Sequence, residues 1–181
     1  MEMRDITDVI EITPSARIET DRHGWRAKCL QRLVRMGLPV PRSVAISSAA
    51  VQDIAKGQPV PKERFRDLFG NGGTLVSVRP SAVRTDWGGP GTVLTVGIND
   101  ASHACLSRSI GQDNADAIYL SFVQSYAINI ARLDPDMFAQ EGPDALSDAL
   151  RLFREEMDEP FPQDPARQLA EVLRSMARAW E

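Results

Sequence analysis

The spacing of apolar residues changes at about residue 100. Before that point, short apolar runs alternate with helical spacing, which predicts strands and helices in turn. The predicted elements are an extended lead-in or edge strand within residues 1–21, a helix opened by Gly24 and stopped by Gly37, a strand at Ser43–Ile46, helices at Ala49–Lys56 and Lys62–Phe69, and strands at Leu75–Val78 and Thr92–Val96. This alternation predicts a mixed sheet with helices packed on it.

After Asn99 the pattern is helical throughout. We expect helices at residues 100–110, with Asp100 as N-cap, at 115–133 and at 143–157, and a last one that starts at Pro165 with Asp164 as its N-cap. The sequence therefore predicts an α+β (α/β) fold: an α/β nucleotide-binding lobe at 1–100 and a helical lobe at 101–181.

One stretch of the first lobe carries candidate chemistry. Thr74–Asn99 reads TLVSVRPSAVRTDWGGPGTVLTVGIN, an apolar strand that delivers Arg79 to a loop of small residues before a second apolar run. A cation beside a glycine loop can hold an anion, because backbone N–H groups approach the ligand closely there. An arginine at a strand end can equally be a salt-bridge partner, and the pattern leaves both readings open.

Composition and charge narrow the class of protein. The 181 residues are 43% hydrophobic and 25% charged, as expected of a globular protein, and no apolar run has the length of a membrane span. The charged start, MEMRDITD, has no secretory signal, so we expect a cytoplasmic protein without a membrane partner. The net charge of −4 and the scarcity of aromatic residues near the basic ones argue against nucleic acid.

The charges are unevenly distributed. Residues 22–42 hold six Lys/Arg and no carboxylate, whereas residues 134–164 hold ten Asp/Glu against two Arg. The basic segment could contact an anion, or it could be a solvated helix face that complements an acidic region. Arg26 falls in the first turn of the predicted helix, where a cation opposes the helix dipole and a bound anion would reverse the sign.

Motif searches exclude several chemistries. There is no P-loop, no dinucleotide-binding G-x-G-x-x-G and no G-x-S-x-G elbow, and the two histidines and the carboxylates lack metal-ligand spacing. The candidate binding set is Arg26, Arg79 and the glycine loop at 86–91, which contains Gly88 and Gly89. Two guanidiniums can hold phosphate oxygens in a bidentate manner.

Four segments resemble the pyruvate, phosphate dikinase and phosphoenolpyruvate synthase-like family. They are CLQRLVRMGLPVP at Cys29–Pro41, LVSVR at Leu75–Arg79, TVLTVGIND at Thr92–Asp100 and PFPQDPARQL at Pro160–Leu169. They follow the family's order with similar gaps, and the resemblance covers about Gly24 to Trp180. It implies the amino-terminal part of an ATP-grasp nucleotide-binding region, which phosphorylates a histidine on a separate domain with ATP.

The resemblance assigns roles to individual residues. The family's triphosphate-binding arginine follows the S-V-R strand and corresponds to Arg79, and its early lysine corresponds to Arg26. In the loop, Gly88 and Thr92 match the family pattern, while its methionines and one aspartate are replaced. Arg26, Arg79, Gly88, Gly89 and Thr92 are thus the expected ATP-binding residues, and no catalytic or metal-binding residue is assigned.

The resemblance also implies what this chain lacks. The family's Mg²⁺-binding carboxylates, the second half of the grasp and the phosphohistidine domain come later in the sequence. We therefore expect a piece of a longer phosphotransferase that is inactive alone, with ATP and those domains as partners. The rewritten loop also allows another hypothesis: a non-catalytic, ATP-grasp-like domain that binds a protein partner.

Overall fold

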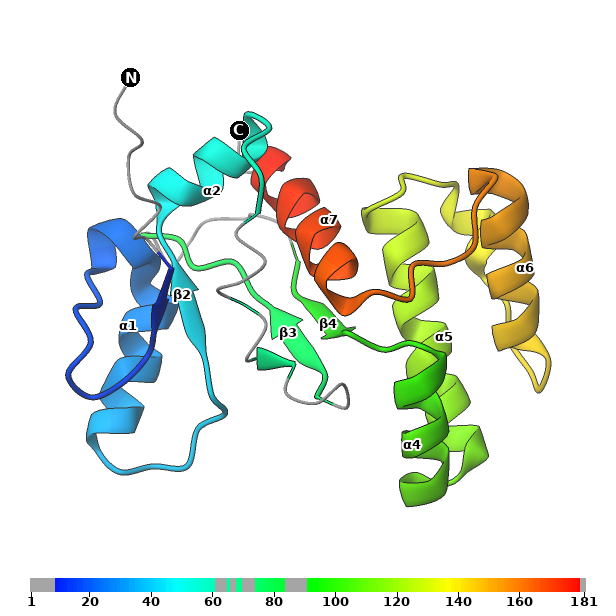
Figure 1. The fold of residues 1–181 in the computed structure, drawn as a ribbon, viewed down its shortest axis with the longest axis horizontal. Coiled ribbons are helices and arrows are strands. Elements are labelled where there is room, and N and C mark those ends of the chain that lie inside the picture. Colours follow the sequence, from blue (N-terminus) through cyan, green and yellow to red (C-terminus); the bar gives the residue numbers. More distant parts are fainter. Residues whose placement is uncertain (1–8, 61–64, 66–67, 70–73, 84–90, 180–181) are drawn as a thin grey trace.

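The computed structural model describes residues 9–60, 65, 68–69, 74–83 and 91–179 (Figure 1). In chain order, the described elements are β1 (Val9–Glu11), α1 (Thr20–Arg35), β2 (Val44–Ile46), α2 (Ser48–Ala55), β3 (Val76–Val78), β4 (Val93–Val96), α4 (Asp100–Ile110), α5 (Gln112–Asn129), the 3-10 helix η2 (Pro135–Phe138), α6 (Ala145–Met157) and α7 (Pro165–Arg178). Helices combined with small sheets are compatible with the predicted α+β class.

The predicted single mixed sheet is wrong for the described residues. β1 pairs with β2, and β3 pairs with β4, in two separate antiparallel ladders. The apolar pattern indicates which residues are strand-like and which face is buried, but it contains no information on a strand's partner or direction. The β3–β4 ladder is irregular: Val76 faces Val96 whereas Val78 faces Val93, so β4 contains one extra residue.

The main hydrophobic core combines residues from both sides of residue 100. Ile54 and Val96 belong to the same cluster as Tyr126, Phe153 and Phe161. The last helix, α7, returns to pack on α2 and on β4, and Figure 1 shows it between the sheets and the α4–α6 helices. The boundary at residue 100 between an α/β lobe and a helical lobe stays a prediction.

An aromatic cluster forms the centre of this core. Tyr126 lies 5.2 Å from Phe161 and 6.0 Å from Phe153 in edge-to-face geometry, measured between ring centroids. Such contacts add to the free energy gained by burying the rings. α5, α6 and the segment before α7 are held together here.

The helix bounds match the prediction only in part: α1 begins at Thr20 and not at Gly24, and α5 spans Gln112–Asn129 and not 115–133. The helix predicted at Lys62–Phe69 lies mostly outside the described residues.

The predicted N-cap of α4 also needs a correction. Asn99, and not Asp100, is the N-cap of α4: its side chain accepts the Ser102 N–H at 2.9 Å, and Ser102 Oγ accepts the Asn99 N–H at 2.8 Å. Asp100 is the first helical residue, and its carboxylate instead accepts the Tyr119 hydroxyl at 3.1 Å. The predicted cap of α7 is confirmed, because Asp164 accepts the Ala166 N–H at 2.9 Å.

Most of the basic run at 22–42 serves local structure. Lys28 donates to the Ile18 carbonyl at 2.6 Å, and Arg35 donates to the Pro14 carbonyl at 2.8 Å. Arg32 lies 4.9 Å from the Trp25 ring centroid in a cation–π contact. Arg42 pairs with Glu11 at 2.7 Å, and this hydrogen-bonded pair holds the pKa of the Glu11 carboxyl below its ordinary value. These side chains fix α1 against the preceding loop and β2 beside β1.

Candidate functional site

Gly24 interrupts α1 and starts a new helical segment. Its dihedral angles are φ 78° and ψ 169°, so the regular helix begins again at Trp25. The residue is buried, and a Cβ added to it would lie 1.8 Å from the carbonyl oxygen of Ser81. The backbone of α1 thus contacts the backbone that follows β3 directly, at a distance that only glycine permits.

Three hydrogen bonds reinforce this contact. The Ser81 hydroxyl donates to the His23 carbonyl at 2.7 Å and accepts the Ala27 N–H at 3.1 Å. The Trp25 N–H donates to the Ala82 carbonyl at 2.8 Å. We call this arrangement, residues 23–27 with residues 79–82, the α1–β3 junction.

The β3–β4 register places two predicted site residues at the same end of one ladder. Val78 faces Val93, so the next residues outward are Arg79 and Thr92. Both are exposed, as is Gly91. Gly88 and Gly89, also expected to bind ATP, lie outside the described residues.

Arg26 and Arg79 lie on the two sides of the junction. Arg26 is two residues after Gly24, and Arg79 is two residues before Ser81, which the Gly24 backbone touches. Both side chains are exposed, and neither forms a hydrogen bond or ion pair with another described residue. The fold therefore brings three of the five predicted residues, Arg26, Arg79 and Thr92, to one region.

Two exposed guanidiniums at the junction can hold an anion. Within the residues that the structure describes, neither Arg26 nor Arg79 has a carboxylate partner that would neutralise it. Among the described residues no group of three or more His, Cys, Asp or Glu could hold a metal ion. No helix in the described part of the chain has the length and apolar character needed to cross a bilayer.

Sequence reasoning missed Ser81. The residue follows Arg79-Pro80, where proline ends the strand, and a serine just past a strand end is an available hydrogen-bonding group. That signal marks a turn and does not identify its partner. His23 and Ala27, which Ser81 connects, are 58 and 54 residues away in the chain.

We expect Ser81→Ala to loosen the junction without unfolding the protein. The substitution removes one donor and one acceptor, and leaves the Ala27 N–H and the His23 carbonyl without this partner. The free energy of unfolding should fall by about 1–2 kcal/mol, measured by urea denaturation. Ser77→Ala, at an exposed position on β3, is the control and should change it by less than ~0.5 kcal/mol. Equal effects of the two substitutions would contradict the role given to Ser81.

Together these features define an α+β protein with two exposed arginines on the two sides of a buried backbone contact. A scan of protein-family models gave no match. The chain is similar to pyruvate, phosphate dikinase of Rhizobium meliloti, with 28% identity over 204 aligned positions that cover 90% of this chain and 22% of the relative. It is 25% identical to the Entamoeba histolytica enzyme of the same name, over 195 positions covering 87% of this chain and 22% of that relative. The chain thus spans about a fifth of the length of these relatives, and the matches support a distant relation.

Proposed function

We propose that the chain is the ATP-phosphate-binding part of a cytoplasmic, pyruvate, phosphate dikinase-like phosphotransferase. In this proposal it forms the amino-terminal part of an ATP-grasp site, from which the phosphoryl group passes to a histidine on another domain. The observation that carries the proposal is the α1–β3 junction, where Arg26 and Arg79 flank one helix start. Similarity to the two dikinases over most of the chain supports it.

Each junction residue has a physical role in the proposal. Arg79, at the end of the ladder, holds one set of phosphate oxygens, and the guanidinium of Arg26 holds another. The Thr92 hydroxyl, at the position opposite Arg79 in the β3–β4 ladder, offers a further donor. Mg²⁺, which supplies charge neutralisation during phosphoryl transfer, and the acceptor histidine come from other parts of the parent protein.

Titrating the chain with ATP and measuring the heat of binding by isothermal titration calorimetry tests the proposal. We expect weak, saturable binding, because most of the length of the related enzymes is absent from this chain. Arg79→Ala should weaken binding about tenfold or more, the loss expected when a charge-assisted contact to phosphate is removed. Arg26→Ala should weaken it similarly, whereas Arg26→Lys should retain most of the affinity because it keeps the charge.

The control is Arg154→Ala, an exposed arginine on α6 that is remote from the junction in sequence and fold. It should leave ATP affinity unchanged. If Arg79→Ala and Arg154→Ala behave alike, the ATP site is not at the junction. Absence of binding by the unsubstituted chain would instead favour the non-catalytic interaction domain.

A further inference from the structure

The helix α1 has two apolar faces. Its inner face includes Ala27 and Val34, which belong to the smaller core cluster or pack against it, together with Ala45 of β2. Trp25 precedes Val34 by nine residues, roughly two and a half helical turns, so its side chain leaves the opposite side of the helix. The residues at helical spacing on that opposite side are Trp25, Cys29, Leu33 and Met36. We call them the outer stripe.

The outer stripe is exposed. Trp25, Leu33 and Met36 keep 38%, 37% and 72% of their accessible surface, and Leu38, just beyond the helix, keeps 47%. These four residues make up half of the large exposed hydrophobic residues in the part of the chain that the structure describes. Single exposed apolar residues are common on protein surfaces, whereas several that form one continuous strip mark an interaction surface.

The charges beside the outer stripe are all basic. From Gly24 to the end of α1, every charged residue is Lys or Arg, and residues 22–42 contain no carboxylate. Arg32 lies on one side of the stripe, 4.9 Å from the ring centroid of Trp25. Arg26 follows Leu33 around the other side of the helix, and both arginines are exposed. The stripe is therefore an apolar strip with a positive rim, which complements an acidic partner.

A second copy of this chain does not fit the stripe. Two α1 helices packed through it would bring the Arg26 and Arg32 side chains of both copies together, and like charges repel at an interface. The acidic helix α6 offers Asp148 and Glu155, but both already pair with Arg151. None of the large exposed hydrophobic residues lies on α6, so its outer face has nothing apolar to set against the stripe.

We propose that the outer stripe is the docking surface for an acidic, amphipathic helix of a partner protein. Such a helix, laid along α1, covers the stripe over about 16 Å, the length of three helical turns. Its apolar side packs on Leu33 and Met36, and the flexible methionine adapts to the shape of that side. Carboxylates on its flanks pair with the guanidiniums of Arg26 and Arg32. Arg79 and Thr92 take no part, so this surface goes beyond the proposed ATP site.

Three labelled peptides of about 18 residues, five helical turns, test the proposal by fluorescence anisotropy with the full chain. The first has leucines at helical spacing and glutamates on both flanks. The second has lysines in place of the glutamates, and the third has the composition of the first in an order without helical spacing. We expect saturable binding of the first peptide and at least roughly tenfold weaker binding of the other two.

Substitutions on α1 locate the binding surface. The double variant Leu33→Gln/Met36→Gln should weaken the acidic peptide about tenfold or more, because it removes apolar contact area. Ile110→Gln is the matched control, since Ile110 on α4 is 40% exposed and lies outside the stripe, and it should change nothing. Circular dichroism checks that the variants keep their helices.

Reversing one charge of the rim tests the chemistry of the partner. Arg32→Glu should weaken the acidic peptide about tenfold and improve binding of the basic one. Arg154→Glu, on α6 at the opposite end of the molecule (Figure 1), should affect neither peptide. Arg79→Ala should weaken ATP binding and leave peptide binding unchanged, so this inference and the ATP proposal can fail independently.

Several results would overturn the proposal. They are equal affinity for the acidic and basic peptides, no saturable binding of the acidic one, or unchanged affinity in Leu33→Gln/Met36→Gln. Sedimentation velocity of the chain alone and co-sedimentation with vesicles of phosphatidylcholine and phosphatidylserine test two other occupants. Self-association or vesicle binding that Leu33→Gln/Met36→Gln abolishes would assign the stripe to a second copy or to a lipid surface, and would refute a partner helix.

Discussion

Replacing Gly24 by alanine should lower the free energy of unfolding by about 3 kcal/mol or more and remove ATP binding. Two penalties combine at this residue. Its φ of 78° is unfavourable for any residue with a Cβ, and the added Cβ would lie 1.8 Å from the Ser81 carbonyl oxygen. That oxygen belongs to the backbone and cannot rotate away, so α1 and the segment after β3 must separate. Arg26 and Arg79 then no longer flank one helix start.

Gly37→Ala is the matched control. Gly37 has a similar φ of 72°, but nothing lies within 4 Å of the position where its Cβ would be. It should therefore show the backbone penalty alone, about 1 kcal/mol. Urea denaturation followed by circular dichroism measures both variants, and calorimetry with ATP measures binding. Equal destabilisation of the two variants would mean that the Gly24–Ser81 contact does not hold the junction.

The local elements could be predicted from the sequence because their signals are local. Gly37, Pro39 and Pro41 end α1, the apolar runs indicate β2, β3 and β4, and Asp164-Pro165 starts α7. Each of these signals acts over a few residues of backbone. Strand pairing is a different problem, since the same apolar runs are compatible with one mixed sheet or with two antiparallel ladders.

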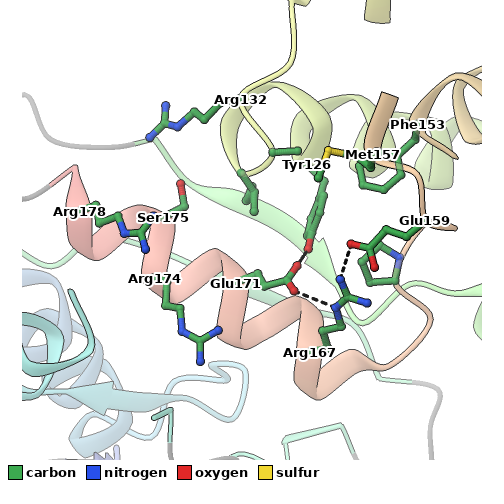
Figure 2. Close-up of a pocket in the computed structure, with 13 residues that line it drawn as sticks. Tyr126, Arg132, Phe153, Met157, Glu159, Arg167, Glu171, Arg174, Ser175 and Arg178 are labelled. Atoms are coloured by element: carbon green, nitrogen blue, oxygen red, sulfur yellow. Dashed lines mark hydrogen bonds and ion pairs between the residues drawn. The ribbon is translucent and has the colours of Figure 1, made fainter. Parts of the chain in front are cut away.

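The candidate site was predictable in part for the same reason. Arg79 and Arg26 stand out as cations beside a strand end and a helix start, which are visible in the sequence. Their proximity depends on the contact between Gly24 and Ser81, which are 57 positions apart in the sequence (81 − 24). A pocket between α5, α6 and α7 was not predicted, because its lining residues come from elements that are separated in the sequence (Figure 2).

Gln168 is a buried polar residue, and a search of the sequence for apolar stripes does not identify such residues. It lies four residues before Val172, on the buried side of α7 that was predicted from Leu169, Val172 and Leu173. A polar residue at that helical spacing is a signal for a buried hydrogen-bonding group. In the structure its side chain is 0% exposed and holds α7 to the residues that follow β4.

Gln168→Leu is expected to destabilise the protein by about 3 kcal/mol or more, although leucine has a similar volume. The amide oxygen of Gln168 accepts the Gly97 N–H at 2.8 Å, and its amide nitrogen donates to the carbonyls of Ile98 and Pro162 at 2.8 and 2.7 Å. Leucine cannot replace any of these bonds, so three backbone groups lose their buried partner at once. Gln112→Leu, which removes one exposed bond to Asp116, should change stability by less than ~1 kcal/mol in the same urea titration. Gln168→Glu keeps the size and the acceptor but loses the donor, and should also destabilise strongly. Near-native stability of both Gln168 variants would show that packing, and not the amide, holds α7 beside β4.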